Sequence, residues 1–290
     1  MKRAWLLVLG LHLIIVGDLW AQTTVITDDV ERTVRLQKPP TRIVTLEPFL
    51  TELVFALGRG AQLVGIAEGS RYPFETYAIP KVRGVAGFMQ GQAAAMKPDL
   101  VIASIDGIDP DQMDRIAAMG AAVVVVYARR LNDVPRLLRL LGTLTSGDGE
   151  SAAREFENRL ERMKAGNLGK PRVSAMVEIQ HRPLTTVSAG HFLTDALEIC
   201  AADNVFYRQI AVTPEVPWDL VYRRNPRAIV GFGSASGEEE FKGNWAVRRA
   251  LEAVREGRLL YMESDVVQHP SPRSPDDIAR LCKLLDTVRP

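Results

Sequence analysis

Short apolar runs alternate with helical patterns along the first half of the chain. Strands are predicted at residues 42–46, 63–67, 97–104 and 121–127, and helices at 51–57, 111–119 and 134–144. The run at 121–127 is almost wholly apolar, which is typical of a strand buried on both faces of a parallel sheet. Strands and helices that alternate at this spacing indicate right-handed βα units. The sequence therefore predicts an α/β lobe over residues 22–146.

The same alternation returns in the second half of the chain. Strands are predicted at residues 172–179, 228–232 and 258–262, and helices at 191–201, 245–255 and 275–288. The last helix has Ser274 as its predicted N-cap and two acidic residues, Asp276 and Asp277, in its first turn, where negative charge is favoured. A second α/β lobe is therefore expected over residues 170–290.

Between these halves lies one long, charged segment of strong helical propensity. Its apolar residues form a single narrow stripe of Ala153, Phe156, Leu160 and Met163, and glycines flank it on both sides. We predict one connecting helix within residues 147–169; a surface helix inside a single domain is the alternative. The expected fold class is thus α/β, with two Rossmann-like parallel-sheet lobes joined by a single long helix. Such lobes bind ligands in a cleft between the carboxyl ends of their strands.

The first 21 residues have the pattern of a signal peptide. A positive start is followed by an apolar run of about 13 residues, too short for a membrane helix, and then by a polar stretch, with cleavage expected after Ala21. An uncleaved N-terminal anchor is the alternative. No cysteine lies near the cut, so no lipoprotein attachment is expected. The mature chain is predicted to reside in the periplasm.

The net charge and the cysteine content limit the kinds of partner and of site that the chain is expected to have. The formal net charge is +1, so there is no basic surface of the kind that nucleic acid requires. The two cysteines, Cys200 and Cys282, would enter an oxidising compartment, where one disulfide bridge is expected rather than a metal site. Two unpaired buried thiols are the alternative. Closing so long a loop would contribute about 3–5 kcal/mol in the chain-entropy model.

A small ligand in such a cleft meets mostly apolar and aromatic walls, with a few polar groups that fix its orientation. The candidates lie in loops that follow predicted strands, although Phe49 and Tyr72 could equally be packing residues. We predict ligand contacts for Phe49, Tyr72, Phe88, Trp218, Asp265, Gln268 and His269.

Three histidines of the second half are candidates for a metal ligand: His269, His181 and His191. No two of them share a helix face, and a lone histidine is more often a surface or satisfied residue, so both interpretations stay open. Arg71 and Arg182 are candidates for an anionic ligand group, with solvated surface charge as the alternative. The loop at 231–237 fits neither a dinucleotide nor a nucleophile motif, and no enzyme activity is expected.

Several segments resemble the periplasmic binding proteins for cobalamin and iron siderophores. The chain opens with TDDVERTVRLQKPPTRIVTLEPFLTELVFALG and continues with KPDLVIAS, HFLTDALEICAADNVF and RRNPRAIV, each similar to a family segment. The positions of Cys200 and Cys282 and the segment SDVVQHPSPR resemble the cobalamin-binding branch more narrowly. This resemblance implies a monomer that delivers a small ligand to an ABC permease of the inner membrane.

The chain also departs from that branch. Gly69 and Val85 replace aromatic residues that face the corrin, whereas Trp218 keeps its place. The two glutamates that dock on the permease have no counterpart, because the first falls on Gly91 and the second in a stretch missing between Trp218 and Asn225.

The expected function is capture of a corrinoid or similar metal chelate, with a cobalt corrinoid or a ferric chelate as ligand and no intrinsic cofactor. The alternatives are iron-siderophore or haem binding, and a periplasmic scavenger or chaperone that has left transport. An enzyme that uses the histidines and a metal is the third hypothesis, and only it predicts turnover.

Overall fold

The first lobe is built on a parallel sheet of five short strands. A computed structural model describes residues 23–264 and 269–289 of the chain; residues 1–22, which include the predicted signal peptide, lie outside it. The strand order is β5-β4-β3-β6-β7, and every neighbouring pair is parallel. The strands are β3 (Ile43–Thr45), β4 (Leu63–Ala67), β5 (Lys81–Val82), β6 (Leu100–Ser104) and β7 (Ala122–Val126). Four of these five were predicted; the two-residue β5 is too short to leave a pattern.

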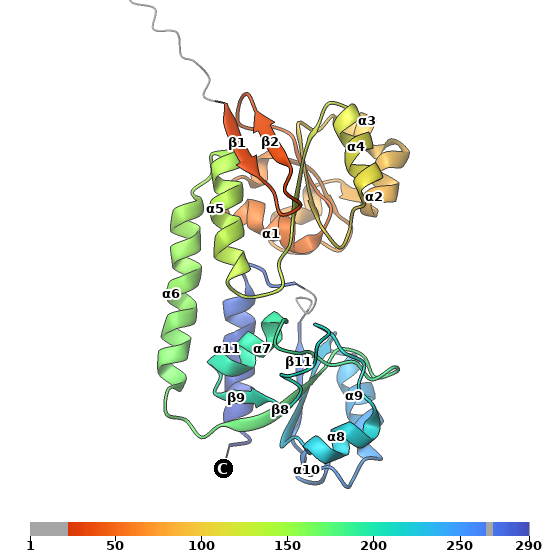
Figure 1. The fold of residues 1–290 in the computed structure, drawn as a ribbon, viewed down its shortest axis with the longest axis vertical. Helices are drawn as coiled ribbons and strands as arrows, with labels where there is room; N and C mark the ends of the chain where they lie inside the picture. The colour runs from red at the N-terminus through yellow and green to blue at the C-terminus, as the bar shows by residue number, and fades with distance from the viewer. Residues whose placement is uncertain (1–22, 265–268, 290) are drawn as a thin grey trace, which may run out of the picture.

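Helices cover both faces of this sheet, and a small antiparallel hairpin lies beside it (Figure 1). The helix α4 begins with a capping box, in which the Asp109 carboxylate accepts from the Gln112 N–H and the Gln112 side chain accepts from the Asp109 N–H. The elements are β1 (Thr24–Thr27), β2 (Thr33–Leu36), α1 (Pro48–Ala56), η1 (Gly60–Gln62), η2 (Phe74–Ala78), α2 (Gly84–Gly87), η3 (Phe88–Gln92), α3 (Ala93–Met96), α4 (Pro110–Ala118) and α5 (Asp133–Thr145).

The second lobe has a parallel sheet of four strands in the order β11-β10-β8-β9. Its strands are β8 (Val173–Glu178), β9 (Ala202–Asn204), β10 (Ala228–Gly233) and β11 (Leu259–Glu263). Its helices are α7 (Phe192–Ile199), α8 (Trp218–Arg224), α9 (Gly237–Ala246), α10 (Glu252–Arg255) and α11 (Ser274–Asp286). Among the described residues, no helix combines the length and the apolar character that a membrane span needs.

The helix α6 (Gly149–Asn167) connects the lobes and runs along the side of both (Figure 1). Asp148 caps it by accepting from the Ser151 N–H at 3.1 Å. Glycine is needed where α6 meets α5, because a Cβ at Gly142 would lie 2.6 Å from the Cα of Gly149. The predicted fold class, with two parallel sheets and a single connecting helix, is confirmed.

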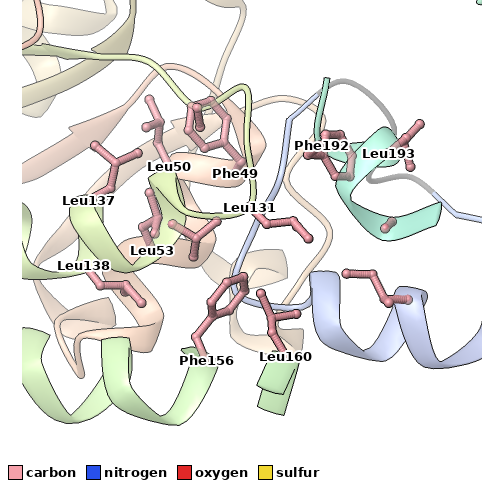
Figure 2. Packing of buried hydrophobic residues seen from close by; sticks show 14 of the residues in the cluster. Phe49, Leu50, Leu53, Leu131, Leu137, Leu138, Phe156, Leu160, Phe192 and Leu193 are labelled. Atoms are coloured by element: carbon pink, nitrogen blue, oxygen red, sulfur yellow. The ribbon is translucent and has the colours of Figure 1, made fainter. Parts of the chain in front are cut away.

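One apolar core runs through both lobes along this helix. Phe156 and Leu160 of the predicted stripe are buried between residues of the first lobe, such as Leu131, and residues of the second, such as Phe192 (Figure 2). Each lobe also has a smaller cluster of its own on the other face of its sheet. The expected disulfide between Cys200 and Cys282 is present and joins the end of α7 to α11.

Three local predictions need correction. The helix expected at 245–255 is two helices, α9 and α10, because the chain turns between Val247 and Leu251. Trp218 was placed in a polar loop, but it begins α8 directly after Pro217. Ser274 is the first residue of α11 rather than its cap, and its hydroxyl accepts from the Ser271 N–H at 2.9 Å.

Candidate ligand site between the lobes

The carboxyl ends of the two sheets meet at one seam. We use the name interlobe seam for the residues there that contact each other across the lobes. The first contact is made by His269, which follows β11 and whose ring stacks on Phe49, which follows β3, with centroids 4.7 Å apart. His269 Nδ1 lies 3.2 Å from the carbonyl oxygen of Ala128, which follows β7. Since a carbonyl oxygen only accepts, Nδ1 must carry the proton, and Nε2 is the nitrogen that remains for a ligand.

Two ion pairs also cross the interlobe seam. The Arg130 guanidinium binds both carboxylate oxygens of Asp195 in α7, with Nε to Oδ2 at 2.8 Å. Arg273 binds both carboxylate oxygens of Glu52 in α1, with one distance of 2.6 Å, and its guanidinium lies 4.5 Å from the centre of the Tyr72 ring. Bidentate pairs of this kind fix orientation as well as adding attraction. These ion pairs therefore help to fix the position of one lobe relative to the other.

In the first lobe, the strand order reverses between β3 and β6. Ligands of open α/β sheets bind outside the carboxyl ends of the strands at such a switch point. Glu47 lies two residues beyond β3, and its Oε1 accepts from the hydroxyl of Ser104, the last residue of β6, at 2.7 Å. Its other oxygen, Oε2, is buried and has no hydrogen-bond partner among the described residues. The switch point of the first lobe thus has a carboxyl group with one hydrogen-bonded oxygen and one buried oxygen that has no partner among the described residues.

Burial raises the pKa of the Glu47 carboxyl above its ordinary value, and the negative charge of Asp106 adds to the rise. The Ser104 hydroxyl and the charge of a protonated His269 act in the opposite direction but are outweighed. The effect of His269 on Glu47 places the His269 imidazole near this carboxyl group. The two residues therefore belong to one polar patch of the interlobe seam.

The second lobe repeats this arrangement. Its strand order reverses between β8 and β10, and the last residue of β8 is again a glutamate, Glu178. Glu178 Oε2 accepts from the indole N–H of Trp245, which is fully buried, and lies 3.2 Å from His181 Nδ1. Burial raises the pKa of Glu178, while its bonds to His181 and Trp245 oppose the rise. This carboxyl group has partners of its own in the protein.

Trp218 completes the cluster around Glu178. Its ring meets Trp245 at 5.5 Å and His181 at 5.5 Å, both edge to face, and the Arg248 guanidinium lies 3.8 Å from its centre. Such contacts stabilise aromatic rings in a fixed orientation. Trp218 is half-buried and packs against the small cluster of the second lobe.

His191 has a structural role. Its Nδ1 accepts from the Leu193 N–H at 3.2 Å and so caps α7, and its ring stacks on Phe192. Burial, with a smaller effect from the charge of His269, lowers the pKa of His191 to about 4. A neutral imidazole that accepts through Nδ1 carries its proton on Nε2, which leaves no lone pair for a metal. The structure therefore argues against His191 as a metal ligand.

The structure brings together some of the predicted ligand residues and not others. Tyr72, about half exposed, and His269, half-buried, lie at the interlobe seam, and Phe49 is buried beneath His269. Asp265 and Gln268 lie outside the described residues. Arg71 and Arg182 are both exposed.

Phe88 requires a correction. It was expected in a loop that faces the ligand, but it begins η3 and is fully buried. Its neighbours around a small cavity include Pro98 and Ala121, which precede β6 and β7 and so mark the amino edge of the sheet, opposite the interlobe seam. This placement argues against a ligand role for Phe88.

The histidines do not form a composite metal site in the part of the chain that the structure describes, because no group of three or more His, Cys, Asp or Glu side chains is close enough there to hold an ion. His181 belongs to the Trp218 cluster, whereas His269 and His191 lie at the seam. Any metal bound here would therefore have to bring most of its own ligands.

Sequence reasoning missed both switch-point glutamates. Each closes an apolar run, RIVTLE in the first lobe and VSAMVE in the second: Glu47 lies two residues beyond β3, and Glu178 is the last residue of β8. That position was the available signal. The predicted ligand contacts were chosen mainly among aromatic residues, so neither glutamate was included.

Comparison with known proteins agrees with this architecture. A vitamin B12-binding protein of Vibrio parahaemolyticus is 26% identical over 254 residues, covering 87% of this chain and 92% of the relative. The vitamin B12-binding protein of Pectobacterium atrosepticum is 30% identical over 224 residues, covering 74% and 80%.

Solved structures share the fold. The periplasmic vitamin B12 binding protein of Vibrio cholerae superimposes with a TM-score of 0.74 at 23% identity, covering 86% of this chain and 98% of that one. A periplasmic heme binding protein of Pseudomonas aeruginosa gives 0.72 at 20% identity, covering 87% and 94%. The family model described as periplasmic binding protein matches residues 43–266, which include both sheets, α6 and both switch points. The chain belongs to the periplasmic binding protein family.

Proposed function

We propose that this chain is the exported solute-binding protein of an ABC importer and that it captures a corrinoid, or a similar planar metal chelate, at the interlobe seam. The family and the vitamin B12-binding relatives support a small-molecule ligand and a permease partner. They also support a periplasmic location, with residues 1–21 as the signal peptide. Relatives of this family are binding proteins rather than enzymes, which supports binding without turnover.

The observation that carries the proposal is the contact between the carboxyl ends of the two sheets at the interlobe seam. The residues beyond the carboxyl ends of β3 and β7 contact those beyond β11, and both sheets offer their preferred ligand edge to the same place. Tyr72 and Trp218 supply aromatic surface from the two lobes, as a flat macrocycle requires.

His269 gives this site a means of contacting a metal. Its Nδ1 donates to a backbone carbonyl oxygen, the arrangement that commonly orients a ligating histidine. His269 would hold the metal of a cobalt or iron chelate through Nε2, or accept a hydrogen bond from the ligand there. The ligand, and not the protein, would supply the metal and its planar donors.

Purified mature protein tests this proposal. We expect cyanocobalamin to bind in a 1:1 ratio in a calorimetric titration, with haemin and a ferric hydroxamate as the competing chelates. Replacing His269 by Ala should weaken binding about tenfold or more, the loss of one good contact. Tyr222→Ala is the matched control, because the second half of α8 leads away from the seam toward the amino end of β10. Unchanged binding by His269→Ala would remove the role of His269.

A second function is favoured by one departure from the family pattern. Gly91, which stands where a docking glutamate is expected, is exposed in η3 with a φ of 138°, and α8 is a short helix of seven residues. A periplasmic scavenger or chaperone for the same ligand would need no permease contact. Capture of the cognate permease by the tagged protein supports transport, and ligand binding without permease capture supports the scavenger.

A further inference from the structure

Glu47 breaks a local rule of helix formation. It is the N-cap of α1, a position that favours Ser, Thr, Asp or Asn because their side chains accept from the first free N–H groups. The Glu47 side chain makes no such bond. A residue that departs from local preference without a compensating local contact marks a position selected for another purpose.

The surroundings of Glu47 form a cradle that fixes its carboxyl group. The Ser104 hydroxyl holds Oε1 at 2.7 Å. The backbone of Gly107 approaches so closely that a Cβ there would lie 2.1 Å from Oε1, so any side chain at 107 would displace the carboxyl group. Oε2 is left buried and without a partner within residues 23–264 and 269–289. An unpaired buried oxygen is costly, and this cost is recovered when a ligand supplies the missing bond.

Burial, rather than the surrounding charges, favours the neutral form of Glu47. Asp106, which follows β6, opposes ionisation, and the Ser104 hydroxyl and His269, which follows β11, favour it. Desolvation outweighs both and raises the pKa of the carboxyl group. A ligand that covers the seam would remove still more water and strengthen this preference.

The mirror position in the second lobe differs in one respect. Glu178 occupies the equivalent switch point, but the Trp245 indole and the His181 imidazole bind its Oε2. The protein therefore uses Glu178 internally, as a positioning residue for His181, with both bonds to Oε2. In Glu47, the Ser104 hydroxyl binds Oε1, and Oε2 is buried without a protein partner among the described residues.

We propose that the Glu47 carboxyl group is a ligand-binding group that pairs, uncharged, with a primary carboxamide at the edge of the bound macrocycle. A neutral carboxyl group donates through Oε2–H to the amide carbonyl oxygen and accepts the amide N–H at Oε1, which has a second lone pair beside the Ser104 bond. This inference rests on the proposed function, because it assigns a contact within the same site.

The experiment uses the full mature protein and cyanocobalamin as the probe. Glu47→Ala should bind about tenfold more weakly than the wild type, because it removes both hydrogen bonds. Glu47→Gln keeps a neutral donor and acceptor of the same shape, so its affinity should stay within about threefold. Glu155→Gln, the same change at an exposed position of α6, is the matched control.

The outcomes separate this inference from the proposed function. Equal binding by wild type and Glu47→Ala would overturn the role of Glu47 while leaving corrinoid binding intact. A loss with Glu47→Gln as large as with Glu47→Ala would overturn the uncharged pairing, since it would mean that the ionised carboxylate is required. A wild type that fails to bind cyanocobalamin would overturn the proposed function, and the carboxamide contact with it.

Discussion

Both lobes have a glutamate at the point where the strand order of the sheet reverses, but the two glutamates make different contacts. Each sheet reverses its strand order beside its first strand, and each places a buried glutamate there, Glu47 in the first lobe and Glu178 in the second. In the second lobe, an indole and an imidazole bind the carboxyl group. In the first lobe, one oxygen has no partner among the described residues.

This difference shows that the position of a residue at a switch point does not by itself make the residue a ligand-binding one. The second lobe uses its carboxyl group to assemble Trp245, His181 and Trp218 into a fixed cluster. The first lobe leaves Oε2 of Glu47 buried and without a hydrogen-bond partner in the part of the chain that the structure describes. A structural and a ligand-binding use of one position can be told apart by asking which oxygen atoms are already satisfied.

The lobes also differ in covalent support, and removing that support gives the largest expected effect. Both cysteines of the chain lie in the second lobe, with a sequence separation of 82. Replacing both by serine should lower the free energy of unfolding by about 2–5 kcal/mol, because the unfolded chain regains the entropy of the open loop. Urea unfolding measures the change, and the wild type under reducing conditions is the control.

Limited proteolysis sharpens this comparison. We expect the first new cleavage sites of the double variant within residues 170–290. Cleavage that begins in the five-stranded sheet instead would contradict the idea that the crosslink stabilises the second lobe in particular.

The next effect concerns acid. The pKa of His191 is lowered from 6.5 to about 4, so the unfolded chain binds a proton more readily than the folded one. Stability from this residue is complete above its unfolded pKa and is lost as the pH falls toward 4, by up to about 1.4 kcal/mol per pH unit and about 3 kcal/mol in all. In His191→Asn, which retains a capping acceptor, the slope of unfolding free energy against pH should be shallower. Equal slopes would mean that other groups govern acid sensitivity.

The smallest expected effect tests the two glutamates directly. Trp245→Phe keeps an aromatic ring but removes one donor to Glu178, and should lower the free energy of unfolding by about 1–3 kcal/mol. Glu47→Gln retains the bond to Ser104 and should change it by less than about 1 kcal/mol. Thermal or urea unfolding of the two variants, side by side, measures both. If Glu47→Gln were the more destabilising, the assignment of structural and ligand-binding roles would be reversed.

Much of the fold could be predicted from the sequence because most of its strands are continuous apolar runs. The strands at β6, β7 and β10 and the helix α6 lie close to their predicted positions. The strands β5 and β9 were missed because two or three residues carry no periodicity. The long helix expected at 245–255 was wrong because Val247, Leu251 and Val254 recur at helical spacing although the chain turns between Val247 and Leu251.

The site was harder to predict than the fold. Phe88 was expected in a loop that faces the ligand, yet its burial depends on which edge of the sheet its segment crosses, and that is a tertiary property. Glu47 and Glu178 look identical in sequence context. Their difference arises from Trp245 and His181, which are distant in the chain or on the far side of a turn, and only the assembled lobe reveals it.

The apolar core that continues from one lobe to the other along α6 limits how far the two lobes can move apart. Phe156 and Leu160 are wedged between side chains of both halves (Figure 2). Wide hinge opening would peel these contacts apart and expose them to water, at a cost of about 25 cal/mol for each square ångström uncovered. Ligand capture is therefore expected to proceed through small shifts at the interlobe seam rather than through a large change of shape.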